Sequence, residues 1–449
     1  MGWAGCPCPA PPRATGLVAG AGARDGAAEG RGPVIDAVRS RIVPTRRDAP
    51  SHDTTSPSRA AQTPLRLVTA FVAMATLTAA IATALLSSGP AQAALSTSPP
   101  PVRHVWIIQL ENESYANVLV HSTHEYLGHT LPSLGEVLTS YYSTGHESLD
   151  NYISEVSGQA PNAYTQADCQ RYINVTPGVL LPNGQAVGLG CVFPTTVKTI
   201  ADQLVAKGLT WKGYMEDMGN KPARDNTNAT GDCGHPILNT EDDTQLATNG
   251  DQYATRHNPF MYFHTIIDNP KMCDDVVPLT RLANDLKRIS TTPNYSWITP
   301  NLCDDGHDAS CAGTNLDGTK IGGLYATDLW LHHYVPMIMA SPAYKANGLI
   351  IVTWDESETE DGGSCCGEIP GPGSPLPGLV GLGGGHIATI LISKYIKPGS
   401  TDSTSYNHYA MLASVEDIFG LSHVGMADAT GLTTFGPDVF NDYRPAATK

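Results

Sequence analysis

Four short runs of apolar and β-branched residues constrain the fold of this chain more than any other feature. Mostly apolar runs of this length, bounded by proline, glycine or polar residues, are typical of strands that are buried on both faces. Such strands occur mainly in parallel sheets that helices cover on both sides. The runs are Val102–Leu110, Tyr295–Thr299, Leu349–Trp354 and Ile387–Ser393.

Helical patterns separate these runs. Gly208 and Gly420 each follow such a pattern and predict where the helix ends, whereas Pro336 lies inside one and would kink it or end it early. Strands that alternate with helices predict an α/β fold with a mostly parallel central sheet and helices on both faces. The helical patterns are Val197–Lys207, Leu324–Met339 and Tyr409–Phe419, and the polar stretches 215–275 and 356–385 are predicted to be long loops.

The first 93 residues are predicted to lie outside the folded domain. Residues 1–60 are rich in Gly, Ala, Pro and Arg without periodicity, which indicates a disordered leader or a misassigned translation start. Residues 61–93 contain an uncharged apolar run and end on Ala91-Gln92-Ala93, the small-x-small pattern of a signal-peptidase site. We therefore expect a signal peptide over 61–93, secretion, and a folded domain over 94–449. The alternative is a chain that the uncleaved run anchors in a membrane.

The charge of the predicted domain excludes one class of partner. The chain has 27 Lys and Arg against 43 Asp and Glu, of which nine and five precede residue 94. The remaining 18 basic and 38 acidic residues give the predicted domain a net charge of −20. A body this acidic repels phosphate backbones, so we expect no nucleic-acid partner. For the same reason we expect no stable association with an anionic membrane after signal cleavage.

The cysteine count predicts disulfides. Cys6 and Cys8 lie in the leader and eight cysteines remain, an even number that suits four bridges in an exported chain. Cys169–Cys191 and Cys303–Cys311 are the natural short-loop pairs, although pairing does not follow from sequence alone. A zinc site is less favoured, because no CxxC pair occurs after the leader.

Polar side chains flank the predicted strands, where open α/β sheets bind their ligands. Taken singly, an acidic pair after a strand is usually a helix cap or a solvated turn. Several such groups at one sheet edge favour a metal site instead, and these donors suit Mg, Ca, Mn, Fe or Zn. His386 adds less, because it precedes its strand. The flanking groups are Glu111-Asn112, Asp304-Asp305-Gly306-His307-Asp308, Asp355-Glu356 and His386.

Ser148 is the candidate nucleophile, an assignment that two family resemblances imply. It lies three residues before Asn151, at the start of a helical pattern that closes with Ser157-Gly158. The alternative is that Ser148 caps this helix, and the two roles are compatible. No GxSxG elbow surrounds Ser148, so a serine esterase is less favoured.

Two resemblances support this assignment. Ser148-Leu149-Asp150-Asn151 resembles the nucleophile segment of nucleotide pyrophosphatases in the alkaline phosphatase superfamily, with Asp150 where proline is usual. Residues 102–421 resemble the bacterial phosphoesterase family of secreted acid phosphatases and phosphatidylcholine-type phospholipases C. The matching pieces are Glu111-Asn112-Glu113-Ser114-Tyr115, Asn151-Tyr152, Val156-Ser157-Gly158-Gln159, His257-Asn258-Pro259-Phe260, Ile298-Thr299-Pro300-Asn301-Leu302, Gly306-His307-Asp308, Thr353-Trp354-Asp355-Glu356, Leu391-Ile392-Ser393, Lys397-Pro398-Gly399, Tyr406-Asn407-His408-Tyr409 and Glu416-Asp417-Ile418-Phe419-Gly420-Leu421.

The family resemblance implies an alkaline phosphatase-like fold and a phosphoesterase domain over 94–449. We expect hydrolysis of phosphate monoesters, with a phosphate-ester small molecule or a phospholipid headgroup as substrate. The chain ends soon after the last matching piece, which favours the smaller acid phosphatases, including those that act on phosphoinositides. The alternatives are a phospholipase C-like phosphodiesterase and a non-catalytic, secreted Ca-binding protein.

The chemistry of these residues suggests their roles. One divalent cation would be held by Glu111, Asn112, Ser148, Asp355 and Glu356. Phosphate contact or leaving-group protonation would come from Asn151, His257 and His307. Asp308 would orient His307 or bind metal, and His386 is either a ligand or a structural residue.

Overall fold

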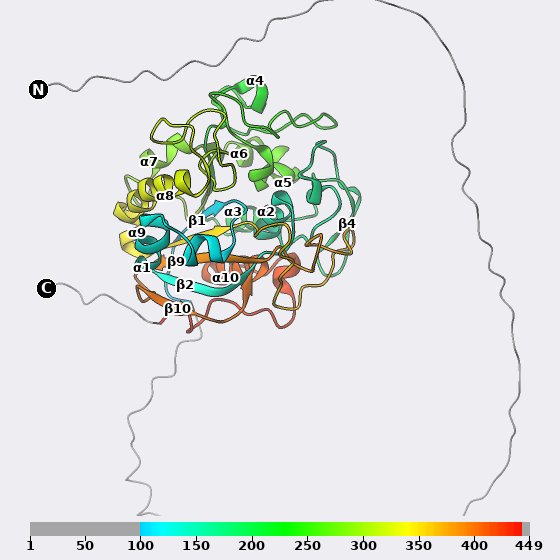
Figure 1. Cartoon of the computed structure of the whole chain (residues 1–449). Coiled ribbons are helices and arrows are strands. Elements are labelled where there is room, and N and C mark those ends of the chain that lie inside the picture. The colour runs from blue at the N-terminus through cyan, green and yellow to red at the C-terminus, as the bar shows by residue number, and fades with distance from the viewer. Residues whose placement is uncertain (1–98, 442–449) are drawn as a thin grey trace, which may run out of the picture. The chain divides into compact units, whose positions relative to one another are not determined.

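A nine-stranded sheet forms the centre of the structure, a computed structural model that describes residues 99–441 (Figure 1). The strand order is β10-β2-β9-β8-β1-β7-β5-β6, and β11 pairs with β2. The strands are β1 (His104–Leu110), β2 (Glu136–Tyr142), β5 (Trp211–Met215), β6 (Val276–Pro278), β7 (Tyr295–Thr299), β8 (Gly348–Trp354), β9 (His386–Ser393), β10 (Ser400–Asp402) and β11 (Tyr406–Asn407), and a separate hairpin pairs β3 (Thr176–Leu180) with β4 (Ala186–Leu189).

The sheet is mostly parallel, as the sequence predicts. β8, β1, β7, β5 and β6 pair in parallel, and all seven residues of both β1 and β8 are buried. β9 is the exception, because it runs antiparallel to both β8 and β2. The start of β9 therefore lies at the same sheet edge as the end of β8. His386 thus lies at the same sheet edge as the end of β8, although it precedes its own strand.

Helices cover both faces of the sheet. On β1, Trp106 packs against Tyr344 of α9, with ring centroids 6.3 Å apart. On β7, Trp297 packs against Tyr152 of α2 at 5.9 Å. Because Trp297 is in register with Ile107, the neighbour of Trp106, the two tryptophans point to opposite faces. This confirms the predicted α/β class with helices on both faces (Figure 1).

The helices around the sheet form two groups. The group on the α2 face is α2 (Ser148–Ser157), α3 (Ile200–Ala206) and α10 (His408–Phe419), which contact one another. The other group includes α1 (Leu131–Leu134), α8 (Gly323–Ala340), α9 (Pro342–Asn347) and the short helical turns η1 (Ala116–Val120) and η2 (Tyr126–Thr130). Short helices elsewhere are α4 (Pro222–Asp225), α5 (His264–Ile267), α6 (Pro270–Cys273) and α7 (Leu282–Asp285).

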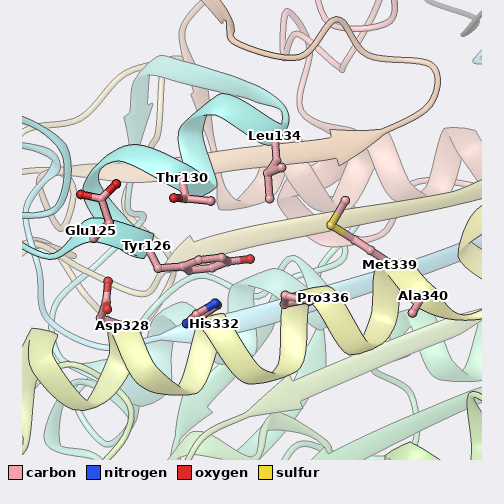
Figure 2. A pocket seen from close by; sticks show the side chains of 9 residues that line it. All are labelled: Glu125, Tyr126, Thr130, Leu134, Asp328, His332, Pro336, Met339 and Ala340. Atoms are coloured by element: carbon pink, nitrogen blue, oxygen red, sulfur yellow. The ribbon is translucent and has the colours of Figure 1, made fainter.

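Helix α8 continues past Pro336 to Ala340, so the predicted early end is wrong. Apolar residues on both sides of the proline, Leu331 and Val335 before it and Ile338 after it, are buried in the core. This burial offsets the backbone hydrogen bond that the proline removes. Pro336 itself borders a cavity of about 510 Å³ between η2 and α8 (Figure 2).

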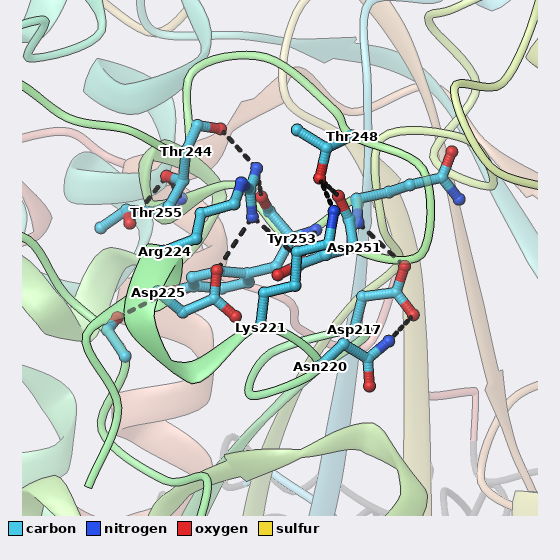
Figure 3. A network of polar contacts seen from close by, with 12 residues as sticks. Asp217, Asn220, Lys221, Arg224, Asp225, Thr244, Thr248, Asp251, Tyr253 and Thr255 are labelled. Carbon is cyan, nitrogen blue, oxygen red and sulfur yellow. Dashed lines mark hydrogen bonds and ion pairs between the residues drawn. The ribbon is translucent and has the colours of Figure 1, made fainter.

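Residues 215–275 form an insertion that contains only helices of four residues or fewer, close to the predicted long loop. Arg224 organises it (Figure 3). Its Nη1 donates to Oδ1 of both Asp225 and Asp251 at 2.9 Å, and its Nη2 donates to the carbonyl oxygen of Tyr253 at 2.8 Å. Hydrogen bonds from the Arg224 guanidinium thus hold together a segment that lacks regular backbone pairing. The segment 356–385 contains no helix or strand, as predicted.

Four disulfides cross-link the described residues. The predicted pairs Cys169–Cys191 and Cys303–Cys311 are both present, and Cys233–Cys273 and Cys365–Cys366 complete the set. The predicted leader and signal peptide, 1–60 and 61–93, lie outside the described residues. Between residues 99 and 441, no helix combines the length and apolarity needed to cross a bilayer.

Removal of the Arg224 side chain should destabilise the fold. Arg224→Met leaves two buried carboxylates without their cation, so we expect the free energy of unfolding to fall by about 3–5 kcal/mol in urea denaturation. Arg171→Met is the control, because the Arg171–Glu241 pair is more than half exposed and should contribute at most about 1 kcal/mol. Equal losses in the two variants would contradict the organising role of Arg224.

Burial of Glu416 should make stability depend on pH. Desolvation raises the pKa of this carboxyl on α10 to about 9. The folded state therefore keeps a proton that the unfolded chain releases above about pH 4.5. The free energy of unfolding should fall as pH rises from about 4.5 to 9, by up to about 1.4 kcal/mol per pH unit from this group. Urea denaturation of Glu416→Gln should show a smaller slope than the exposed control Glu241→Gln.

Candidate active site

Ser148 is the first residue of α2 and points toward the end of β1. Its hydroxyl donates to Oε2 of Glu111 at 2.7 Å. It does not cap the helix, because Glu147 occupies the N-cap position and Oδ1 of Asp168 accepts from the Leu149 amide at 3.0 Å. The N-cap alternative for Ser148 is therefore wrong. The helix ends at Gly158 in the left-handed conformation (φ +64°), as the small-residue-glycine pair predicted.

Glu111 is the centre of the site and is fully buried. Its Oε1 accepts from the Tyr152 hydroxyl and lies 3.2 Å from Nε2 of His257. Burial raises the pKa of Glu111 well above its ordinary value, and the nearby charges of Asp355 and Asp305 raise it further. One carboxylate thus contacts Ser148, a tyrosine and a histidine.

The ends of β1 and β8 join in one hydrogen-bonded network. Oδ1 of Asp355 accepts from the backbone amides of Asn112 at 2.9 Å and Glu356 at 2.7 Å. Oε1 of Glu356 accepts from the Asn112 side chain at 2.7 Å, and its Oε2 contacts Nδ1 of His146. Asn112 adopts φ +46°, a left-handed conformation that costs energy in a non-glycine residue and that these bonds maintain.

The residues of this network fit a divalent cation. Asn112 Oδ1 and Asp355 Oδ2 are buried and accept no hydrogen bond. Burial raises the pKa of both Asp355 and Glu356, so the cluster is costly to ionise as it stands. A cation among them would satisfy the free oxygens and offset the crowded negative charge. A donor set of carboxylate, amide and hydroxyl oxygens suits hard divalent metals.

Asn151 and His257 lie next to this network. Oδ1 of Asn151 accepts from the Gly145 amide at 2.9 Å, and its Nδ2 donates to the carbonyl oxygens of Gly145 and Glu147. In this arrangement Asn151 holds the loop that leads into Ser148. His257 is buried against the Tyr152 ring, with centroids 5.4 Å apart. Burial lowers the pKa of His257 well below its ordinary value, and the neighbouring Arg256 guanidinium lowers it further.

The remaining predicted residues lie farther from the network. His307 and Asp308 are exposed, and the His307 amide donates to Asp305 Oδ1 at 3.1 Å. The His386 ring lies between the rings of Tyr115 and Tyr142, with centroids 4.5 and 5.2 Å away. Its Nε2 lies 3.0 Å from the Thr139 carbonyl oxygen rather than beside a carboxylate of the network.

Three groups at the site were assigned no role of their own from the sequence. Asp305 is fully buried, its Oδ2 lies 3.7 Å from Nδ1 of His257, and its carbonyl oxygen accepts from the Glu111 amide at 3.0 Å. His146 contacts Glu356 from two residues before Ser148. Arg256 Nε lies 3.4 Å from Oδ2 of Asp168, the residue that caps α2. Asp305 lay within a motif already singled out, whereas nothing local distinguishes His146 or Arg256.

Curated proteins similar to this chain include several phosphatases. A "Probable acid phosphatase" of Kluyveromyces lactis is 25% identical over 73% of this chain and 60% of its own length. A "Phosphate-repressible acid phosphatase" of Penicillium chrysogenum is 24% identical, over 69% of this chain and 60% of its own length. This chain thus spans about 60% of these two fungal relatives. A "Phosphatidylinositol-3-phosphatase" of Mycobacterium tuberculosis is 24% identical over 73% of this chain and 80% of its own length.

Solved structures give a weaker likeness. A Vibrio parahaemolyticus protein in the alkaline phosphatase superfamily covers 74% of this chain and 71% of its own, at 14% identity and a TM-score of 0.41. The model of the Phosphoesterase family matches residues 130–422, which include Ser148, the 215–275 insertion and Asp355-Glu356. The resemblance predicted from sequence is confirmed, and the chain belongs to the phosphoesterase family.

Proposed function

We propose that this protein is a metal-dependent phosphatase that hydrolyses phosphate monoesters with Ser148 as its nucleophile. The observation that carries the proposal is the 2.7 Å hydrogen bond from Ser148 to Glu111 at the first turn of α2, beside the free Oδ2 of Asp355. The printed names of the relatives, acid phosphatase and phosphatidylinositol-3-phosphatase, support the same chemistry.

The metal would be held by residues from two strand ends and one helix. Glu111 and Asn112 follow β1, Asp355 and Glu356 follow β8, and Ser148 starts α2. A divalent cation bound there would lower the pKa of the Ser148 hydroxyl and stabilise negative charge on the phosphoryl group. The oxygen donors suit several divalent metals, so the chemistry does not select one.

The residues of the chain would divide the remaining work. Glu111 Oε2 already accepts the Ser148 hydroxyl hydrogen, so it can take that proton as Oγ bonds to phosphorus. The start of α2 favours an anion, because its first backbone N–H groups are free of helical partners. His257, kept neutral by burial, can hydrogen-bond a phosphate oxygen. The exposed His307 can protonate the leaving alkoxide, and water then releases phosphate from Ser148.

The family members suggest the substrate class. A phosphate monoester, either a small molecule or a phospholipid headgroup, fits the printed names of the relatives. We also propose that the protein is exported, because four disulfides form among the described residues and such bridges persist in oxidising compartments.

Loss of the Ser148 hydroxyl should abolish catalysis. We expect Ser148→Ala to lower kcat for p-nitrophenyl phosphate by at least about 10³-fold, because no other group replaces the nucleophile. The matched control is Ser157→Ala, which removes a buried hydroxyl that bonds to the Ile153 carbonyl at the far end of the same helix. Substantial activity in folded Ser148→Ala would exclude Ser148 as the nucleophile.

Metal removal should also abolish activity. Dialysis against a chelator should abolish phosphatase activity, and addition of a divalent metal should restore that activity. Glu356→Gln weakens a predicted ligand, so it should raise the metal concentration for half-maximal activity by at least about tenfold. Glu358→Gln, two residues farther along and exposed, is the control and should match the parent. Full activity after exhaustive chelation would contradict the metal requirement.

A further inference from the structure

One face of α2 connects to both strand ends that carry the predicted metal ligands. Ser148, Tyr152 and Glu155 are spaced by four and three residues and therefore share that face. Ser148 and Tyr152 both donate to Glu111, which follows β1. Glu155 does not reach Glu111, and its Oε1 instead lies 2.8 Å from Nδ1 of His408, the first residue of α10.

His408 extends this connection to the end of β8. Its Nε2 lies 2.7 Å from the backbone carbonyl oxygen of Asp355. A carbonyl oxygen has no proton to give, so Nε2 carries the hydrogen and donates it. Nδ1 lies 2.8 Å from the Glu155 carboxylate, an ion-pair contact outside hydrogen-bond geometry, and 3.2 Å from the Tyr141 hydroxyl. Glu155 and His408 are both almost completely buried, so water does not compete for these contacts.

The bond from His408 completes the fixation of Asp355. The Asp355 amide donates to the Leu110 carbonyl at 2.9 Å, and Oδ1 accepts from two backbone amides. With its carbonyl bound by His408, Asp355 retains a single polar atom without a partner, the buried Oδ2. That carbonyl belongs to the peptide group that joins Asp355 to Glu356. The orientation of this peptide group therefore sets the direction of both predicted ligands, Asp355 and Glu356.

We propose that Glu155 and His408 form a positioning pair that holds the Asp355-Glu356 peptide in its metal-binding orientation. The pair does not contact substrate or metal. It acts through the backbone, as outer partners of metal ligands commonly do. The inference rests on the proposed metal-dependent function, and it explains why the Tyr406-Asn407-His408-Tyr409 motif lies so far along the chain from the other site residues.

A second histidine provides a matched control. His104 is also buried and its Nδ1 lies 2.9 Å from a backbone carbonyl oxygen, that of Pro293. It lies at the start of β1, at the opposite sheet edge from Glu111 and Asp355. His104→Asn removes a comparable buried ring, although its amide nitrogen can still reach the Pro293 carbonyl from the Nδ1 position, so it reports the general cost of losing a buried histidine ring.

The test measures metal affinity without relying on turnover. Five metal-free, full-length proteins are titrated with Mn²⁺ by calorimetry, and thermal unfolding is recorded for each. They are the parent, His408→Asn, His408→Gln, Glu155→Gln and His104→Asn. A glutamine amide nitrogen reaches about as far along the side chain as Nε2, whereas that of asparagine reaches only to Nδ1. We expect His408→Asn to weaken Mn²⁺ binding by about 10–100-fold. His408→Gln should recover most of the affinity, and His104→Asn should bind like the parent.

Each outcome decides between the proposals. Equal Mn²⁺ affinity in His408→Asn and His104→Asn, with a parent that binds Mn²⁺ and hydrolyses p-nitrophenyl phosphate, overturns the positioning pair alone. A parent that neither binds a divalent metal nor hydrolyses the ester overturns the proposed function as well. If His408→Asn does not fold, His408→Gln and Glu155→Gln decide. In that case, Mn²⁺ affinity that is retained in His408→Gln and weakened in Glu155→Gln supports the pair. Equal Mn²⁺ affinities in these two variants overturn it.

Discussion

The close approach of buried carboxylates at one sheet edge is the constraint on which the rest of the site depends. The register of β1 and β8 pairs Leu110 with Trp354, so Glu111 and Asp355 emerge side by side. Both are fully buried, and the nearby charge of Asp305 raises the cost of ionising Glu111 further. Buried like charges are strongly unfavourable unless they are protonated, paired or bound to a cation. The fold nevertheless keeps these carboxylates together, which supports a function that uses them jointly.

Helix α2 brings polar side chains to both strand ends at this sheet edge. Its first residue supplies the hydroxyl, its second turn supplies Tyr152, and its third supplies Glu155, so one rigid helix spans both strand ends. Asp168 and Asn151 fix the start of the helix and the loop before it. Placing the proposed nucleophile on a regular helix limits its positional freedom more than a loop would, and that would favour attack along a single line.

The sequence predicts those parts of the fold and site that depend on local patterns. β1, β7, β8 and β9 lie in the short apolar runs and were predicted, whereas β2 and β5 were not predicted, because partly exposed residues such as Thr139 and Lys212 interrupt their patterns. The direction of β9 is set by its pairing with β2 and β8, which no local pattern encodes. The metal-site candidates follow strands and could be predicted from that position. Glu155 and His408 meet only because α2 and α10 pack together, and 253 residues separate them along the chain.

The acidity of the protein makes a local positive charge necessary for any anionic substrate. A domain with a net charge of −20 repels a phosphate ester at long range, and the carboxylates of the site add to that repulsion at short range. The start of α2 and the partly buried Arg256 supply partial compensation, yet Arg256 is already engaged by Asp168. A divalent cation among Glu111, Asp355 and Glu356 would offset the negative charge of this buried cluster and attract a phosphate oxygen. The proposed cation would then serve substrate binding as well as catalysis, because the carboxylates alone would repel phosphate and the bound cation would attract it.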